Sequence, residues 1–339
     1  MSKWYFENGA DRDVAVSSRI RLARNLAGFP FPNKMTAEQK FEVIQKVSDA
    51  LMKTENRFNN EFQFFDMDKI SRVQAYSMVE RHLISPDFAE NGQGRALLIT
   101  KDEKVSIMIN EEDHIRIQVL SSGLELKKAY EVADEIDSVL DRSLEFAFDK
   151  ELGYLTECPT NLGTGMRAGV LLHILALDGM GAVNALNSTI SKIGLTMRGT
   201  HGEGTKVRSS MYQLSNQVSL GISEQAAIDN LQTMTSQIIG RERQARAGID
   251  KDKLEDMVYR AWGLLTNARM INSKEFLDLA SKVRLGAGME LLDIVDIGKI
   301  DELIMICQPA SLQATAGGNL DDETRDKMRA RTVREELNK

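Results

Sequence analysis

Three consecutive segments with strand patterns, residues 95–100, 104–110 and 115–120, constrain the fold most strongly. The second and third have the period of two that points every second side chain to one face of a strand. The polar stretches 101–103 and 111–114 between them are short enough to be chain reversals, which predicts an antiparallel meander. Residues 127–148 then carry apolar side chains at helical spacing, as expected of a helix that covers this sheet.

Helical patterns dominate the rest of the chain. They extend over residues 223–247, 252–270, 273–285 and 321–337, whereas strand patterns become scarce after residue 205. The predicted fold class is therefore α+β, an antiparallel sheet flanked by helices in residues 1–248, followed by an all-helical C-terminal domain in residues 249–339. An earlier helix is expected to begin at Thr36, with Phe41 and Ile44 on its apolar side.

Composition excludes several classes of protein. The 43 Lys and Arg residues against 50 Asp and Glu residues give a net charge of −7, so no overall positive field draws the chain onto nucleic acid or an anionic membrane. Two cysteines, Cys158 and Cys307, are too few for a disulfide framework or a structural zinc site. The first residues lack an apolar signal region and no run of about 18 apolar residues occurs, so we expect a cytoplasmic protein.

A nucleotide site in this chain would need a phosphate cradle without a glycine-rich loop. Neither G-x-x-x-x-G-K-[ST] nor the protein-kinase set of G-x-G-x-x-G, H-R-D and D-F-G occurs. Arginines are the alternative, because their planar forks grip phosphate oxygens in pairs and stay charged. Arg19 and Arg21, in the Ser-Ser-Arg-Ile-Arg segment 17–21, would share one face of a strand, and Arg24 could join them if a helix follows. Taken alone, the segment is more typical of a solvated basic stretch.

Residues 110–116 combine three consecutive carboxylates with a histidine and Arg116. Like charges held this close raise one another's pKa, which prepares a general base. Taken alone, the segment is more typical of an exposed acidic turn.

The most distinctive segment is Cys-Pro-Thr-Asn-Leu-Gly-Thr-Gly-Met-Arg-Ala-Gly at residues 158–169. Its proline, asparagine and glycines predict an irregular loop after Cys158. The run from Arg167 to Leu175 is expected to begin a helix whose N–H groups and dipole point back at that loop and attract anions. By spacing alone, the segment predicts an anion-binding loop with a reactive thiol, and the glycine-rich stretch 198–204 predicts only a loop.

Together and in this order, the segments at residues 17–21, 110–116, 158–169 and 198–203 resemble the catalytic domain of the phosphagen kinases, the family of creatine and arginine kinases. Within that superfamily the chain is similar to the bacterial protein arginine kinases. The resemblance covers about residues 14–241 and continues into the tail at residues 325–330. It implies a catalytic domain of glutamine-synthetase-like fold in residues 1–248, and phosphoarginine binding and dimerisation in residues 249–339.

The resemblance also implies roles for individual residues. Glu112 is expected to take a proton from the acceptor guanidinium, Glu203 to help orient it and Cys158 to lie beside it. His82 is expected near the adenine or ribose of ATP, with Mg²⁺ held mainly through the nucleotide phosphates. The other residues implied in ATP binding are Ser17, Ser18, Arg19, Ile20, Arg21, Arg116, Arg167, Ala168, Gly169, Val170, Leu171, Arg198, Gly199, Thr200, His201, Gly202 and Glu203.

Two features indicate the acceptor. Metabolite phosphagen kinases carry an additional helical N-terminal domain that helps to enclose a small substrate, whereas here the arginine segment begins at Ser17. We therefore expect an arginine side chain on a protein. The Arg-Asp-x-x-Arg-Ala segment resembles an allosteric phosphoarginine pocket, in which residues at i and i+4 face one way on a helix. Its members are Arg325, Asp326, Arg329 and Ala330.

The family resemblance further implies a link to the Clp protease, inactivation of a stress-response repressor and a zinc-finger activator protein. Apolar residues at 294, 297, 300, 303 and 304 suggest self-association, so a homodimer or higher oligomer is expected. Two alternatives stay open: a kinase for a small guanidino compound, and a catalytically silent adaptor that binds phosphoarginine.

Overall fold

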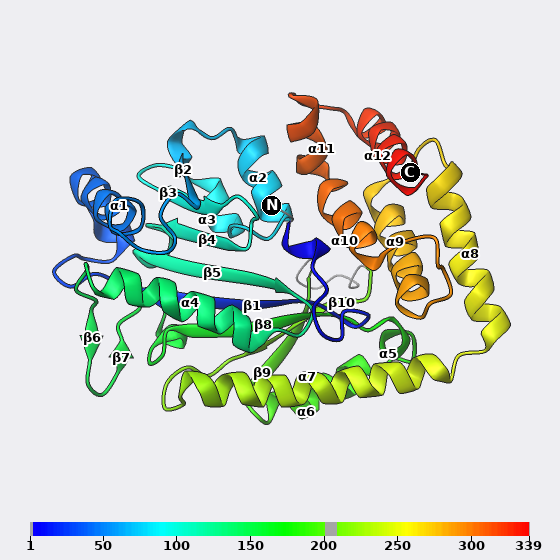
Figure 1. Ribbon diagram of the computed structural model, residues 1–339, viewed down its shortest axis with the longest axis horizontal. Helices are drawn as coiled ribbons and strands as arrows, with labels where there is room; N and C mark the ends of the chain where they lie inside the picture. The colour runs from blue at the N-terminus through cyan, green and yellow to red at the C-terminus, as the bar shows by residue number, and fades with distance from the viewer. Residues whose placement is uncertain (1–2, 201–208, 339) are drawn as a thin grey trace.

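The computed structural model describes residues 3–200 and 209–338. Within them, eight strands form one antiparallel sheet in the order β2-β3-β4-β5-β1-β8-β10-β9 (Figure 1). These strands are β1 (Ala15–Arg24), β2 (Phe62–Asp66), β3 (Ala96–Thr100), β4 (Val105–Ile109), β5 (Ile115–Ser122), β8 (Met166–His173), β9 (Leu195–Gly199) and β10 (Met211–Asn216).

The predicted meander is confirmed, because β3 pairs with β4 and β4 pairs with β5. The edge of β5 is then covered by β1, from the beginning of the chain, and β1 pairs on its other side with β8. The arginine segment 17–21 therefore lies in the middle of the sheet.

Residues 166–173 form a central strand, so the helix predicted to begin at Arg167 is wrong. An apolar run such as 170–172 fits a fully buried strand as well as a helix, and pairing with β1 and β10 on both sides decides for the strand. Helix α5 (Leu175–Gly179) begins only after this strand. The loop 158–165 consequently faces no helix dipole from this segment. Strand β10 had no recognised signal in the sequence.

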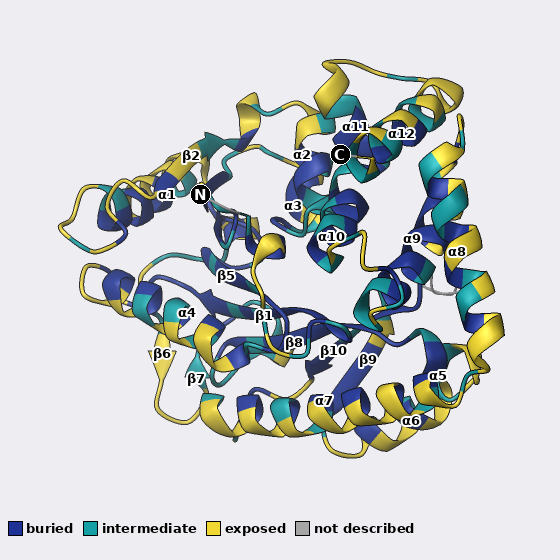
Figure 2. Ribbon diagram, turned by 45° about the vertical axis from the view of Figure 1, so that its right-hand side comes forward, coloured by how far each residue is buried: buried dark blue, intermediate teal, exposed yellow. Residues whose placement is uncertain are grey.

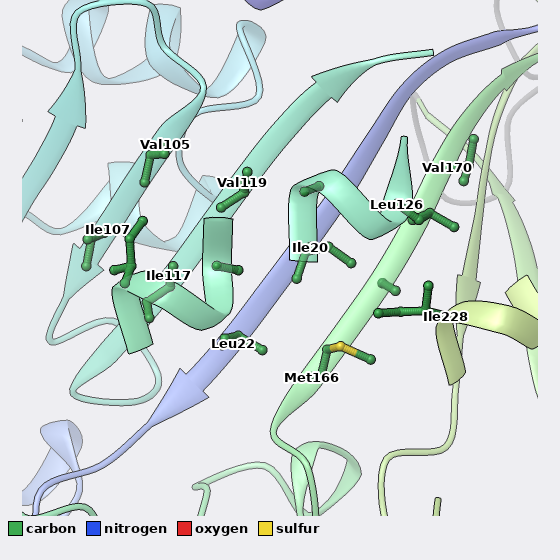
Figure 3. Packing of buried hydrophobic residues seen from close by; sticks show 14 of the residues in the cluster. Ile20, Leu22, Val105, Ile107, Ile117, Val119, Leu126, Met166, Val170 and Ile228 are labelled. Atoms are coloured by element: carbon green, nitrogen blue, oxygen red, sulfur yellow. The ribbon is translucent and has the colours of Figure 1, made fainter. Parts of the chain in front are cut away.

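One face of the sheet is covered by α1 (Ala37–Met52), α4 (Leu126–Asp141) and α7 (Glu224–Ala247), while α6 (Val183–Ser191) lies beside β9. Ile20, Val170 and Ile228 meet in this core (Figure 3). The helix predicted over 127–148 ends at Asp141, and the chain continues into the small hairpin of β6 (Phe148–Asp149) and β7 (Gly153–Tyr154). Helix α1 begins after Thr36 as predicted, but Phe41 is 64% exposed because it lies on the solvent side of the helix.

The opposite face is covered at its two ends. Helices α2 (Arg72–Glu80) and α3 (Pro86–Glu90) pack over β3 and β4 through Met78 and Leu97. The other end lies under the predicted all-helical region, in which the sheet residue Leu171 and the helical residue Val258 belong to one core. The helices of this region are α8 (Lys251–Asn267), α9 (Ser273–Gly288), α10 (Ile297–Ile306), α11 (Pro309–Ala316) and α12 (Asp322–Leu337). Figure 2 shows the strands between these layers largely buried.

The helical region uses most of its apolar residues internally. Ile300, Leu303 and Ile304 lie in its core, so they do not form the predicted self-association surface, and Ile294 is 66% exposed. Helix α7 ends at Ala247 and α8 begins at Lys251, on either side of the predicted domain boundary, which stays a prediction. Among the described helices, none is both long and apolar enough to cross a membrane.

Candidate active site

A cavity of about 550 Å³ lies over the part of the sheet that is open between α2–α3 and the helical region. Its floor comes from β1, β5, β8, β9 and β10, and its walls from the segment after α2 and from the connection before α11. The polar and charged residues that line it are Ser17, Arg19, Arg21, Glu80, His82, Ser85, Arg116, Gln118, Arg167, Arg198, Thr200, Gln213, Ser215 and Gln308. Such a volume suits a small organic ligand of nucleotide size.

Strand alternation brings the predicted arginines together. Arg19 and Arg21 point into the cavity, whereas Ile20 between them belongs to the core on the other face. Arg21 is opposite Arg167 in the β1–β8 register, and Arg116 on β5 is opposite Ala23. Three neighbouring strands therefore present their arginines to the same side.

Not every predicted binding residue points into the cavity. Ile20, Ala168 and Val170 pack in the core beneath the sheet, and the Ser18 hydroxyl donates to the Gly123 carbonyl, 2.9 Å away. Gly169 does face the cavity side, where a Cβ would lie 2.6 Å from Gln213 Nε2. Ser18, Ile20, Ala168 and Val170 could therefore contact a ligand only through main-chain atoms.

The cavity arginines carry positive charge that the described residues do not neutralise. Within residues 3–200 and 209–338, no ion pair forms at Arg19, Arg21 or Arg167, and Nε of both Arg21 and Arg167 is buried without a hydrogen-bond partner. Burial, reinforced by the neighbouring guanidinium groups, lowers the pKa of Arg19 to about 10 and holds that of Arg21 well below its usual value. A bound polyanion would relieve both effects.

Arg116 differs because it pairs with Glu111, whose carboxylate also accepts a hydrogen bond from Ser85. Burial opposes ionisation of Glu111, but the Arg116 charge and these hydrogen bonds outweigh it and lower its pKa. Glu111 thus holds Arg116 in place at the start of β5.

The β4–β5 reversal keeps one carboxylate available. Asp113 accepts hydrogen bonds from Asn25 Nδ2 at 2.6 Å and from the Glu157 amide at 2.9 Å. The Glu112 carboxylate, in contrast, forms no hydrogen bond or ion pair within the described part of the chain. Burial, reinforced by the neighbouring Asp113 charge, raises the pKa of Glu112, which favours its acting as a proton acceptor.

The Cys158 loop lies against the arginine cluster. Cys158 Sγ is 3.0 Å from Thr160 Oγ1, and Cys158 is near enough to Arg167 to act on its pKa, although burial dominates and lowers it. Gly163 has a φ of +98° and its Cβ would lie 2.3 Å from the Ser219 carbonyl oxygen, so the loop requires glycine there. A smaller cavity of about 240 Å³ extends from Thr160 and Asn161 to Arg167 and Arg198.

Of the remaining predicted ATP-binding and catalytic residues, some line the cavity and others lie outside the described part of the chain. His82, Leu171, Arg198, Gly199 and Thr200 line the main cavity. His201, Gly202 and Glu203 lie outside the described residues.

Several lining residues were not predicted. Gln213 Oε1 accepts a hydrogen bond from Arg19 Nη2 at 3.2 Å, and Gln118 Nε2 donates to the His82 carbonyl at 2.7 Å. The period-two pattern of β10 could have indicated Gln213, since it alternates with the buried Tyr212 and Leu214. No sequence signal indicates Gln308, which comes from the helical region.

The predicted phosphoarginine pocket lies on α12. Arg325 pairs with Asp322, while Arg329 is 1% exposed and donates from Nη1 to Asp326 at 2.6 Å. Arg329 also donates to the carbonyls of Cys307 and Ile271. A phosphate bound here would compete with Asp326 for Arg329.

The architecture of this chain is a broad antiparallel sheet with arginines on its open face. Solved guanidino kinase structures share this fold. A lombricine kinase structure aligns with a TM-score of 0.60 at 24% identity, over 71% of this chain and 70% of that chain. The duplicated taurocyamine kinase from Schistosoma mansoni with bound transition state analog components aligns with a TM-score of 0.61 at 26% identity, over 81% of this chain and 41% of that chain.

Family models and sequence relatives narrow the class. Residues 42–245 match the C-terminal catalytic domain of ATP:guanido phosphotransferases, and residues 251–339 match the C-terminal domain of the protein-arginine kinase McsB. A protein-arginine kinase of Halothermothrix orenii is 44% identical over 100% of this chain and 97% of its own length. A protein-arginine kinase of Desulforamulus reducens is 43% identical over 99% of this chain and 96% of its own length. The chain therefore belongs to the protein-arginine kinase family of ATP:guanido phosphotransferases.

Proposed function

We propose that this chain transfers the γ-phosphoryl group of ATP to the guanidinium group of arginine side chains in proteins. The observation that supports this most is that arginines without ion-pair partners among the described residues line one cavity, and that Glu112, a carboxylate of raised pKa, is close enough to the lining residue Arg116 for that cation to act on its pKa. The arginines suit a nucleoside triphosphate, and the carboxylate suits a cationic acceptor.

The phosphates of ATP would bind between β1, β5, β8 and β9. Arg19, Arg21, Arg116, Arg167 and Arg198 would contact them, and His82 would lie near the nucleoside. Preorganised cations at the γ-phosphoryl stabilise the charge that spreads over its oxygens in the transition state. By family resemblance, Mg²⁺ would be held mainly by the phosphates, whose charge it would neutralise.

Glu112 would act as the general base. A guanidinium group has a pKa above about 12 and no available lone pair, so it must lose a proton before it attacks phosphorus. Glu112 takes that proton, the nitrogen forms the N–P bond, and the bond from phosphorus to the bridging oxygen of ADP breaks. Cys158, beside Arg167, would orient the acceptor without forming a covalent intermediate. Glu203 would help to orient it.

Substitution Glu112→Gln tests this assignment. The neutral amide cannot accept the proton, so we expect kcat for arginine phosphorylation to fall about 10²- to 10⁴-fold, while affinity for ADP changes less than about twofold. The matched control is Glu151→Gln, an exposed carboxylate beside β7, which should leave both values unchanged. An equal loss of nucleotide affinity in Glu112→Gln would contradict the assigned role.

Acceptor preference separates the proposal from a small-molecule guanidino kinase. The enzyme is incubated with ATP and either free arginine or an unfolded arginine-rich protein, and acid-labile phosphate is measured on each. We expect phosphate on the protein; phosphate only on free arginine would establish the alternative. No phosphate on either, with phosphoarginine still bound, would indicate a silent adaptor.

The regulatory role is part of the same proposal. Arg325, Asp326, Arg329 and Ala330 would bind phosphoarginine, and protein marking would serve Clp-dependent degradation and repressor inactivation in the cytoplasm, with a zinc-finger activator and a homodimer as further expectations. These follow from the family resemblance. Arg325→Ala should keep basal arginine phosphorylation and lose the response to added phosphoarginine; an unchanged response would contradict the pocket.

A further inference from the structure

The helical region supplies part of the wall of the nucleotide cavity. Gln308, in the connection between α10 and α11, lines the cavity together with His82 and Leu171. A second, small cavity is lined by His82, Leu171 and Ile304, so α10 stands at this same end. Leu171 is opposite Ser17 in the β1–β8 register, four residues and roughly 13 Å along β1 from Arg21. Gln308 therefore lies toward the end of the cavity marked by His82 and Leu171, which the proposed function assigns to the nucleoside.

Gln308 is held in place by its own region. Its Nε2 donates to the Ile304 carbonyl at 2.8 Å, and the preceding Cys307 carbonyl accepts a hydrogen bond from Arg329 Nε at 2.9 Å. Its Oε1 accepts no hydrogen bond within the described residues. That oxygen is available to a donor such as a ribose hydroxyl or a base amino group.

One carboxylate joins α11 to the other wall of the cavity. Glu80 accepts hydrogen bonds from the backbone amides of Ala310 and Ser311 at 2.8 and 2.7 Å, and from Ser311 Oγ at 2.8 Å. These amides are in the first turn of α11, where N–H groups have no partner inside the helix and a negative charge is favoured. Helices α2 and α11 lie side by side as a result (Figure 1).

Glu80 is also close in sequence to the nucleoside-facing loop. It is the last residue of α2, and His82 follows two residues later with a φ of +63°. Gln118 Nε2 donates to the carbonyls of His82 and Leu83, which ties this loop to the cavity floor. A shift of α11 away from Glu80 would therefore move Gln308 relative to the His82 loop, which stays on the cavity floor.

We propose that Gln308 is a nucleoside-contacting residue contributed by the helical region, and that Glu80 is a positioning residue that holds this wall closed on the nucleotide. The proposal rests on the proposed function in that it takes ATP as the ligand of the cavity. It adds that nucleotide binding and the seating of α11 on α2 are linked, so each strengthens the other.

Two substitutions test the contacts in the full-length protein. Glu80→Gln removes the charge that caps α11, and Gln308→Ala removes the contact itself. For both we expect the KM for ATP and the Kd for ADP to rise about tenfold, with kcat at saturating ATP and the KM for a protein acceptor within about twofold. The matched controls are Glu90→Gln, whose carboxylate accepts a hydrogen bond from the Tyr76 hydroxyl on α2, and Gln313→Ala on α11 outside the cavity.

Hydrogen exchange supplies a measurement that a purely structural role would not change. In the unsubstituted protein, ADP should slow exchange of the Ala310 and Ser311 amides, and in Glu80→Gln it should not. Bound ADP that leaves both amides unchanged, or a Kd for ADP unchanged in both variants, would overturn the proposal. Arginine phosphorylation by the unsubstituted protein is assayed in parallel: its absence would overturn the proposed function, while an ADP effect on α11 would still support the linkage.

Discussion

Two sets of arginines in this molecule, one buried at a junction and one partly buried in the cavity, have opposite surroundings. At the junction between the sheet and the helical region, Arg284 is fully buried and its Nε is 2.7 Å from Asp301 Oδ1, while Arg246 forms ion pairs with Glu242 and Asp13. In the cavity, Arg21 and Arg167 have no ion-pair partner among the described residues.

The difference separates structural arginines from ligand-binding ones. A buried charge with a well-placed carboxylate is tolerated, and removing one member leaves the other uncompensated. Clustered cations without carboxylates repel one another and destabilise the folded chain, so they are of use only to an anionic ligand. The presence or absence of carboxylate partners therefore distinguishes the two sets.

The largest effect is expected at the junction. Arg284→Met leaves Asp301 buried with only the more distant Arg12, at 3.7 Å, as a cationic neighbour. We expect the free energy of unfolding to fall by about 3–5 kcal/mol, measured by urea denaturation. Arg260→Met, which removes an exposed pair with Asp256, should change it by less than about 0.5 kcal/mol. Similar losses in both variants would show that burial of the junction pair has no special weight.

Replacing a cavity arginine should have the opposite effect on the free energy of unfolding. Arg21→Met removes a guanidinium group that is repelled by Arg19, Arg116 and Arg167, so we expect no loss of unfolding free energy and a gain of up to about 1 kcal/mol. Affinity for ADP, measured by calorimetry, should fall about 10- to 100-fold because a charge-assisted contact is lost. A large loss of stability with unchanged ADP affinity would place Arg21 with the structural arginines.

Arg116 sharpens the comparison, since it is a cavity arginine with a carboxylate partner. Glu111→Gln should lower the unfolding free energy by about 1.5 kcal/mol at pH 7. Because the folded-state pKa of Glu111 is lowered, the stabilisation is present above its unfolded value and is lost as pH falls through the folded value. The stabilities of the two proteins should therefore converge in acid, as measured by urea denaturation at a series of pH values. A gap that stays constant with pH would contradict an ionic contribution from Glu111.

Local patterns predicted much of this molecule. Strand patterns in residues 95–120, with a period of two from residue 104 onward, specified the meander, and Thr36 specified the start of α1, because side-chain alternation and helix capping act over a few residues. The spacing of Arg19 and Arg21 was enough to put both on one face of a strand. Which ligand they face was indicated only by the ordered set of motifs.

Long-range pairing decided the rest. The run after Arg167 is compatible with helix or strand, and only hydrogen bonds to β1 and β10 made it a strand. Arg24, a candidate for the phosphate cluster, instead pairs with Asp137 and lies 3.5 Å from the centre of the Tyr154 ring.

Sequence composition could not separate Glu111, Glu112 and Asp113, which are adjacent carboxylates. The folded chain gives Glu111 a cation and Asp113 two hydrogen bonds, and leaves the Glu112 carboxylate without a hydrogen bond or ion pair among the described residues. Burial raises the pKa of both Glu112 and Asp113, so their partners and not their pKa values distinguish them. The sequence by itself therefore determined the secondary structure of the meander, the tail helices α8, α9 and α12, and the chemical types at the site, whereas α10 and α11 were not specified. Only the tertiary structure decided which of these charges have partners, because chain reversal and packing bring the groups together: Asp113 meets Asn25 and Glu157, which are 88 and 44 residues away along the chain.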